Sequence, residues 1–298
     1  MKSFKKFLAE GGIAIKTSSR INQENVKATL DDVFKKLLST LKIKRTDVSP
    51  LGSTGKKKPG DSSGDIDLAV NVNAVIKANK IVNPKEVFPL LLKALKKHTP
   101  EINDSSGLGV VSGAWPIANV DGNQPNQFVQ LDLMGVDNLE LSDFTFWSPS
   151  FEQSKWKGLH RNSLLIGIAS NMKFETVKTA LDNDGVEVPV VFKRRFLDFR
   201  KGVVEGLQSI EGKNGQPVKT KKTLQTTVVA GTPVDIVKVL LGPDFSVSDA
   251  VSFESIWKII NSNSKFIWKK NKQQILKFAA ETILTAKGTL PPELQRFA

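Results

Sequence analysis

The sequence predicts an α+β fold, with a mixed β-sheet in the N-terminal half and a mainly helical C-terminal half that carries a basic β-hairpin. Two observations predict this class. In the first half, amphipathic and alternating patterns occur in the order helix, strand, strand, helix, strand, strand. In the second half, helical patterns predominate and two basic strand patterns flank a turn signal. We therefore expect an N-terminal arm over residues 1–20, a first domain over 21–148 and a second domain over 149–298.

The composition is that of a folded, basic protein without cysteine. The 298 residues are 40% hydrophobic, enough to bury a full core. The absence of cysteine excludes disulfides, thiolate zinc sites and a cysteine nucleophile, and it fits a reducing cytoplasm. With two histidines, any metal ligands are expected to be carboxylates. No apolar run approaches the roughly 18 to 20 residues of a membrane-spanning helix, so we expect no membrane association.

The net charge of +13 favours polyanionic partners such as nucleic acids or nucleotides. The alternative is that many soluble proteins are simply basic.

The first predicted elements lead into a loop of small polar residues. A helix is expected over residues 25–41, because apolar positions recur there at spacings of three and four. A short strand over 47–51 precedes the loop GSTGKKKPGDSSG, whose glycines and proline cannot sustain a regular element. The strand DIDLAVNV, residues 65–72, follows directly.

A second helix and two more strands complete the first half. Asn83 is expected to cap the helix and Pro84 to occupy its first position, with apolar residues recurring through Leu95. Strand patterns over 107–114 and 128–136 flank a polar, turn-rich stretch.

The second half begins with a helix expected over 158–172. Two long basic strands are expected over 188–208 and 218–230, and Asn214 with Gly215 between them is typical of a hairpin turn. Cap residues and periodicity predict further helices over residues 232–242, 252–261 and 265–287.

Three aspartates form the candidate site. Side chains alternate along DIDLAVNV, so Asp65 and Asp67 share one face while the apolar residues enter the core. The strand FVQLDLMGV buries its valine and leucines and turns Asp132 to the opposite face. If the two strands are neighbours, the three carboxylates converge. Clustered carboxylates stay ionised at neutral pH only with a cation, and oxygen ligands suit Mg²⁺ or Mn²⁺.

A candidate phosphate-binding loop precedes these aspartates. Gly52 and Ser53 end a short strand and open a loop whose amides and hydroxyls can bind phosphate oxygens, with lysines at 56–58 close by. A phosphate loop beside a carboxylate metal site is suited to phosphoryl transfer. Each part alone is a weak signal, because DxD and GS pairs occur by chance in many chains.

The string LGSTGKKKPGDSSGDIDL, followed by VQLDLM, resembles the nucleotidyltransferase superfamily that includes DNA polymerase beta, poly(A) polymerases and CCA-adding enzymes. The interval from Gly52 to Asp65 is most similar to that of the oligoadenylate synthetase and cyclic-nucleotide-forming branch. The resemblance covers residues 25–140 and implies a nucleotidyltransferase palm. Many members have Gly-Thr where Lys57–Lys58 stand here, and often a Ser where Gly64 stands.

The resemblance implies a role for each matched residue. Gly52 and Ser53 would bind the donor triphosphate. Asp65 and Asp67 would hold two metal ions, and Asp132 would complete the metal site and assist deprotonation of the acceptor hydroxyl. The implied reaction moves a nucleoside monophosphate from an NTP to a hydroxyl, most naturally on RNA or tRNA, and releases pyrophosphate. The alternatives are synthesis of cyclic or short oligonucleotides, nucleotidylation of a protein or small molecule, and an inactive nucleic-acid-binding module.

Basic residues beyond position 150 are candidate contacts to phosphate. Lys155, Lys157 and Arg161 could reach a triphosphate, or they form a solvated helix face. The two basic strands could bind an RNA or DNA backbone, or their lysines protect an exposed sheet edge. The candidate nucleic-acid contacts on them are Lys193, Arg194, Arg195, Arg200, Lys219, Lys221 and Lys222.

The first residues, MKSFKKFLAE followed by Gly-Gly, are similar to the N-terminal targeting peptides of tailed-phage internal head proteins. Those peptides are cut after a Glu that follows Leu or Ile by two positions. This resemblance implies a cut after Glu10 and a phage protein that is packaged in the head and acts in the host cytoplasm. An ordinary amphipathic N-terminal helix is the alternative that we favour.

Overall fold

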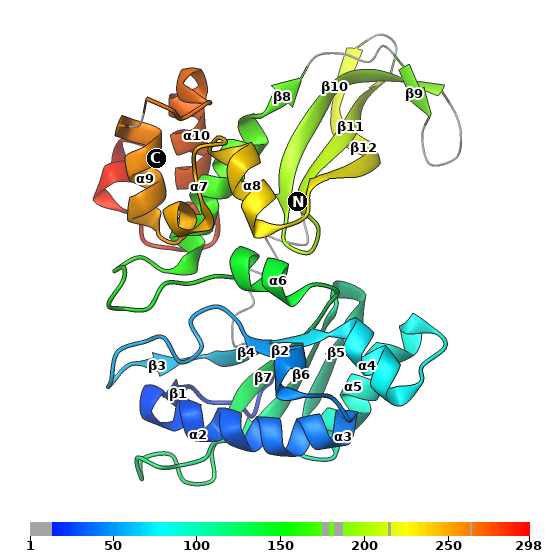
Figure 1. The fold of residues 1–298 in the computed structure, drawn as a ribbon, viewed down its shortest axis with the longest axis vertical. Helices are drawn as coiled ribbons and strands as arrows, with labels where there is room; N and C mark the ends of the chain where they lie inside the picture. Colours follow the sequence, from blue (N-terminus) through cyan, green and yellow to red (C-terminus); the bar gives the residue numbers. More distant parts are fainter. Residues whose placement is uncertain (1–13, 175–178, 182–186, 214–215, 263) are drawn as a thin grey trace. The chain divides into compact units, whose positions relative to one another are not determined.

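The computed structural model describes residues 14–174, 179–181, 187–213, 216–262 and 264–298. The chain divides into two compact units, Met1–Gly158 and Leu159–Ala298 (Figure 1). The segment 149–157, assigned above to the second domain, belongs to the first unit. One contact that holds it there is a hydrogen bond from the Phe151 amide to the Lys56 carbonyl, at 3.0 Å.

The first unit is built on a five-stranded mixed sheet, which confirms the predicted α+β class. Its strand order is β2-β4-β7-β6-β5. Strands β4 and β7 are parallel, and every other neighbouring pair is antiparallel. The strands are β2 (Val48–Pro50), β4 (Asp65–Asn71), β5 (Ile102–Ser105), β6 (Val110–Pro116) and β7 (Phe128–Val136).

Helices that pack on this sheet bury its apolar face. The helix predicted over 25–41 is confirmed as a continuous helical segment made of α2 (Gln23–Val33), a π-helical turn (Phe34–Leu38) and α3 (Ser39–Leu41). The predicted cap at Asn83 is also confirmed, because its side chain accepts from the Lys85 amide at 3.1 Å at the start of a 3-10 turn. That turn leads into α5 (Val87–Lys96).

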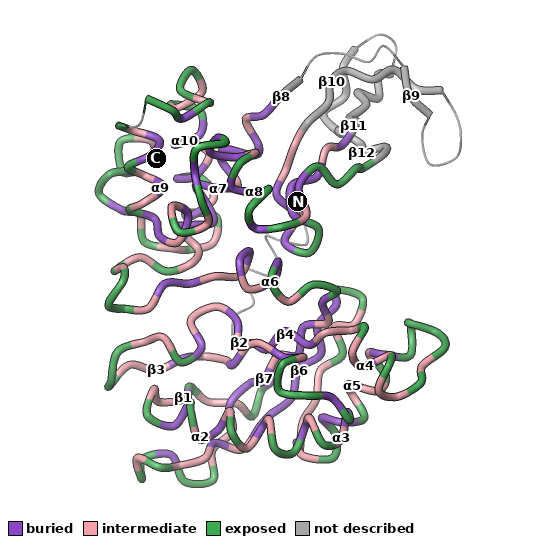
Figure 2. The backbone as a smooth tube through the Cα atoms, viewed as in Figure 1, coloured by how far each residue is buried: buried purple, intermediate pink, exposed green. Residues whose placement is uncertain are grey.

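The core of this unit joins both kinds of element. Val26 of α2, Leu91 of α5 and the strand residues Ile66 and Leu131 belong to one buried cluster. Figure 2 shows the same layering, with buried backbone along β4, β6 and β7 and exposed backbone on the outer side of α2. The sheet is therefore supported by packed helices on the side opposite to the candidate site.

Two helices of the first unit were not predicted. Helix α4 (Val72–Asn79) begins directly after β4, where Asn71 accepts a hydrogen bond from the Ala74 amide and ends the strand one residue before the predicted bound. Helix α6 (Leu139–Thr145) follows β7 in the same way, and Asn138 is its cap.

Residues 14–22 contact the first unit, and they include the described part of the N-terminal arm expected over residues 1–20. The short strand β1 (Ile21–Asn22) pairs with β3 (Ser62–Ser63) immediately before Asp65. Upstream, the Ser19 amide donates to the Phe128 carbonyl at 2.7 Å. The proposed cleavage after Glu10 lies outside the described residues.

The second unit holds more strand than predicted. Its sheet has the order β12-β11-β10-β8, and β9 pairs with β10. The predicted single strand over 188–208 is two antiparallel strands, because Asp198 Oδ1 accepts from the amides of Arg200 and Lys201 and Gly202 adopts a φ of +85°. The strands are β8 (Lys173–Phe174), β9 (Thr179–Leu181), β10 (Glu187–Asp198), β11 (Gly202–Lys213) and β12 (Gln216–Ala230).

The predicted hairpin is formed by β11 and β12, which are antiparallel neighbours. Its expected turn, Asn214-Gly215, lies outside the described residues. The prediction also implied that the strand beginning at residue 188 would pair with β12. Instead, β11 lies between β10 and β12.

The helices expected in the second unit are present, but the one expected over 265–287 begins at Lys272, after a 3-10 turn (Lys269–Asn271). The predicted cap Thr232 accepts a hydrogen bond from the Asp235 amide at 3.2 Å at the start of α8. None of the helices in the described part of the chain has the length and apolar character that crossing a bilayer requires. The helices are α7 (Gly158–Asn171), α8 (Pro233–Leu240), α9 (Phe253–Ser262) and α10 (Lys272–Thr285).

Candidate metal centre

Two neighbouring strands position the three predicted carboxylates. Along β4, Ile66 and Leu68 are fully buried in the core, and alternation turns Asp65 and Asp67 to the other face. Strand β7 runs parallel to β4, with Asp132 directly opposite Asp67 in the register. The expected convergence is therefore confirmed as geometry.

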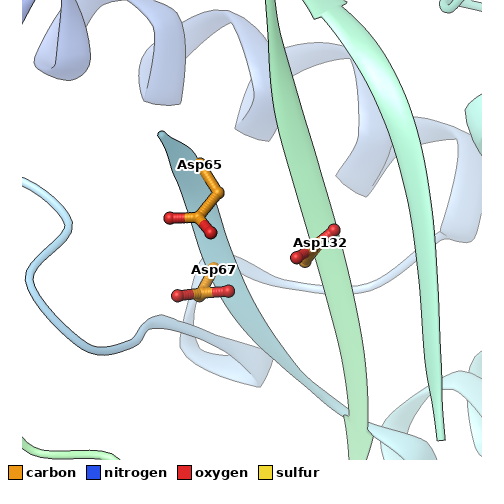
Figure 3. Close-up of side chains that lie close together, drawn as sticks. All are labelled: Asp65, Asp67 and Asp132. Carbon is orange, nitrogen blue, oxygen red and sulfur yellow. The ribbon is translucent and has the colours of Figure 1, made fainter. Parts of the chain in front are cut away.

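The side chains of Asp65, Asp67 and Asp132 lie close together on one face of the sheet (Figure 3). Each offers one carboxylate oxygen, and these oxygens all lie within 4.8 Å of one another. Oxygens bound to a single Mg²⁺ at about 2.1 Å lie about 3 to 4 Å apart, so a small side-chain rotation would bring the three onto one ion. Hard oxygen donors without histidine or cysteine match Mg²⁺ or Mn²⁺.

The electrostatics of the cluster also favour a cation. Burial raises the pKa of Asp67 well above its ordinary value, and the charges of Asp65 and Asp132 raise it further. Burial likewise raises the pKa of Asp132 to about 6, against hydrogen bonds from Ser112 and Gln130 that lower it. Ionisation of these carboxylates is costly without a cation, and it becomes favourable when a divalent cation neutralises their charges.

Asp132 is held by a neighbour on its own strand. The Gln130 amide nitrogen donates to both carboxylate oxygens of Asp132, at 3.0 Å each. The Gln130 amide oxygen accepts from the backbone amides of Ala14 and Ile15, at 2.9 and 3.2 Å. Because Gln130 is buried with both ends bonded, its amide has one favourable orientation. The strand pattern places Gln130 beside Asp132, but no local signal predicts the contact from residues 14 and 15.

The predicted phosphate loop begins beside Asp67. Gly52 has a φ of +59°, a left-handed conformation that glycine adopts without strain, and its amide donates to the Phe146 carbonyl at 3.1 Å. A Cβ at Gly52 would lie 3.5 Å from Asp67 Oδ2. Ser53 follows in the same turn, where its carbonyl accepts from the Lys56 amide at 3.0 Å. The backbone of this loop therefore passes next to the carboxylate cluster.

The three basic residues expected near a triphosphate have different surroundings. Lys157 is exposed, and after burial its charge is the next cause that lowers the pKa of Lys57 in the loop. Lys155 is exposed with its ammonium 5.2 Å from the Trp156 ring centre. The prediction for Arg161 was wrong, because its side chain is buried in the second unit.

The contacts of Arg161 explain this correction. The side chain is 1% exposed, its Nε donates to the Ala250 carbonyl, and a terminal nitrogen donates to Asn162 Oδ1 at 2.7 Å. Burial lowers the pKa of Arg161 to about 9. Its guanidinium thus donates hydrogen bonds inside the second unit and is not available to a triphosphate. Helical periodicity alone does not distinguish a buried arginine from a solvated one.

Two of the candidate nucleic-acid contacts of the second unit have described side chains, Arg195 and Arg200. Arg195 is paired with Glu205, with 3.3 Å between Nε and Oε2, so its charge is largely neutralised. Arg200 is exposed in the turn between β10 and β11. The side chains of the remaining candidates lie outside the described part of the chain: Lys193 and Arg194 on β10, and Lys219, Lys221 and Lys222 on β12.

No protein-family model matches the chain, and no curated protein matches it at a significant level.

Proposed function

We propose that this chain is a metal-dependent nucleotidyltransferase, which moves a nucleoside monophosphate from an NTP to a hydroxyl and releases pyrophosphate. The observation that supports this proposal most is the convergence of three carboxylates from two parallel neighbouring strands, within 4.8 Å of one another. Their position beside the Gly52 turn adds a backbone able to approach phosphate closely. A nucleotidyltransferase palm is the fold that this sheet and site support.

The proposed roles follow from the donor set. Asp65 and Asp67 would hold two Mg²⁺ or Mn²⁺ ions, with Asp132 as the third ligand. When bound, the ions would lower the pKa of the acceptor hydroxyl and neutralise charge on the leaving pyrophosphate. The Ser53 amide and hydroxyl would bind the donor triphosphate, and Gly52, whose amide donates to the Phe146 carbonyl, would let the backbone come close to it.

The chemical step conserves atoms and charge. The acceptor oxygen forms a bond to the α-phosphorus, and the bond from that phosphorus to the bridging oxygen breaks, so pyrophosphate leaves with the electron pair. Asp132 would assist removal of the hydroxyl proton, and Gln130 would keep its carboxylate oriented. RNA is the acceptor class that we propose, because the net charge of +13 favours a polyanion.

The experiment is a transfer assay with matched variants. The purified protein would be incubated with each α-labelled NTP, Mg²⁺ or Mn²⁺, and pooled RNA, and the products would be identified by mass spectrometry. Asp67→Asn removes a ligand charge with little change in shape. Asp137→Asn is the control, because Asp137 is exposed just beyond the end of β7.

We expect label in RNA with the wild-type protein and the Asp137 variant, and a loss of at least about 100-fold with Asp67→Asn. A free cyclic or oligomeric nucleotide product would assign the chain to oligonucleotide synthesis instead. No transfer to any acceptor, with equal RNA binding by all three proteins, would replace the proposal with a nucleic-acid-binding module.

A further inference from the structure

Two basic side chains lie together beside the carboxylate cluster. The Arg20 guanidinium donates to the Ser62 hydroxyl at 2.8 Å and to the Ser62 carbonyl at 2.7 Å. The Lys57 ammonium donates to the same carbonyl oxygen, also at 2.7 Å. Because both nitrogens contact one oxygen, they lie no farther apart than twice that distance. Ser62 therefore holds two positive charges close together.

These two charges are not neutralised by an ion pair with any described residue. Within the part of the chain that the structure describes, no carboxylate oxygen lies within 4.0 Å of the charged nitrogens of Arg20 or Lys57. Lys157 adds a third positive charge nearby. The pKa of Lys57 is lowered first by burial and then by Lys157 and Arg20, against the opposing charges of Asp65 and Asp61. Like charges held together in partly buried surroundings are relieved by a bound anion.

An exposed aromatic residue lies in the neighbouring loop. The Phe151 amide donates to the carbonyl of Lys56, the residue before Lys57, and the Phe151 side chain is 47% exposed. Exposed rings next to cations are typical of surfaces that bind single-stranded nucleic acid, where bases stack on the rings and phosphates contact the cations.

We infer that Arg20, Lys57 and Lys157 bind a backbone phosphate of a single-stranded RNA acceptor, and that Phe151 stacks on an adjacent base. The inference rests on the proposed function in assigning this phosphate to the acceptor. The remaining N–H groups of the guanidinium and the ammonium are the phosphate donors, and the hydrogen bonds to Ser62 hold both cations in place before binding.

The location of the cations favours the acceptor over the donor. Gly52 adjoins Asp67, whereas Ser62, which both cations contact, lies in β3 three residues before Asp65. Residues two apart on a strand are about 7 Å apart. The Gly52 loop thus lies toward Asp67, and the Arg20–Lys57 pair lies toward Asp65. An in-line displacement needs the incoming and leaving groups on opposite sides of the reacting phosphorus, so the loop is assigned to the donor and the pair to the acceptor.

The test measures RNA binding without catalysis. A fluorescein-labelled RNA hexamer would be titrated in chelator and followed by anisotropy at several salt concentrations. The double variant Arg20→Gln/Lys57→Gln removes the site. The control Lys35→Gln/Lys85→Gln removes the same charge from two exposed helical positions of the same unit. In a second arm, a non-hydrolysable α,β-methylene ATP would be titrated with Mg²⁺.

We expect the double variant to weaken RNA binding about tenfold and to reduce the salt slope by about 1.4, since each phosphate contact to a single strand contributes about 0.7. The control pair should lose less than about threefold by long-range charge alone. Phe151→Ala should weaken binding about fivefold without changing the salt slope, because it removes stacking and no charge. The ATP analogue should bind each protein equally.

Equal RNA binding by the double variant and the control pair would overturn the inference. If the double variant binds the ATP analogue more weakly but binds RNA as the wild type does, the two cations contact the donor triphosphate, and the assignment to the acceptor is overturned. If the double variant does not fold, Lys57→Gln alone is compared with Lys57→Arg, which keeps the charge and should bind as the wild type does. The RNA titration needs neither metal nor turnover. RNA binding that depends on Arg20 and Lys57 in a protein without transfer activity would therefore refute the proposed function but support the phosphate-binding site.

Discussion

Replacing Asp132 by asparagine should stabilise the metal-free protein while it abolishes activity. The folded-state pKa of Asp132 is raised to about 6, from an ordinary value of 3.8. Asp132 therefore binds more protons in the folded than in the unfolded state between these values, so its contribution to the free energy of unfolding falls as pH rises from about 4 through about 6. At about 1.36 kcal/mol for each unit of pKa difference, the loss is about 3 kcal/mol at pH 7.

The asparagine of the variant would be uncharged at every pH and would avoid this loss. It keeps one carbonyl oxygen for the Gln130 amide but loses the second acceptor, which costs about 1 kcal/mol. The expected net gain at pH 7 in chelator is thus about 1 to 2 kcal/mol. The net gain should change sign as pH falls to 4, because the wild-type carboxyl is then largely protonated in the folded state and the lost hydrogen bond leaves the variant about 1 kcal/mol less stable.

Urea unfolding at pH 4, 5, 6 and 7 in chelator measures this difference directly. Addition of Mn²⁺ at pH 7 should then reverse the order, because only the wild type gains the binding free energy, about 2.7 kcal/mol at 100 times the Kd. A stability difference between variant and wild type that does not shift in favour of the variant from pH 4 to 7 in chelator, or an Asp132→Asn variant that is less stable at pH 7, would refute this reasoning.

Three further predictions concern residues around the centre. Gln130→Leu should lower kcat about tenfold with little change in the KM for NTP, because Asp132 loses its two hydrogen bonds while the nucleotide keeps its contacts; a raised KM with unchanged kcat would contradict this role. Gly52→Ala and Gly60→Ala both place a side chain at a positive φ and should each cost about 1 to 2 kcal/mol in unfolding experiments, but only Gly52→Ala should impair transfer, because a Cβ at Gly60 has nothing within 4 Å. Arg161→Met should lower the free energy of unfolding by about 2 to 3 kcal/mol and leave the KM for NTP unchanged, since it leaves buried acceptors without a donor in the second unit.

The candidate centre was predictable from sequence because its signal is local. The period of two along each strand places Asp65 and Asp67 on one face and Asp132 on the face away from its buried neighbours. What the sequence does not contain is the pairing of β4 with β7, which lie more than 55 residues apart and join only in the folded sheet. The three carboxylates could be named, but their mutual distance could not.

Contacts that support the site depend on tertiary structure and were missed. The amides of Ala14 and Ile15 reach Gln130 from more than 110 residues away, and nothing in their own sequence marks them. Arg161 looked solvated because its helix pattern leaves its face undecided, and packing in the second unit decided it. Periodicity predicts faces within an element, whereas packing decides what each face meets.

Local signals explain the remaining differences. Asn71 is a good cap and could have ended the strand and begun α4, but the apolar run through Val72 concealed it. The Asp198 turn was concealed in the same way, by β-branched and aromatic residues on both sides of it. In both cases a capping or turn-forming side chain was the better guide than the continuous apolar pattern.

The most direct test of the central claim is a Mn²⁺ titration followed by electron paramagnetic resonance, in the presence of α,β-methylene ATP. For the wild-type protein and the exposed Asp137→Asn control we predict two bound Mn²⁺ ions per chain, and for Asp67→Asn a loss of at least one of them. Mn²⁺ binding that is the same in all three proteins, or absent from the wild type, would contradict a catalytic metal centre at Asp65, Asp67 and Asp132.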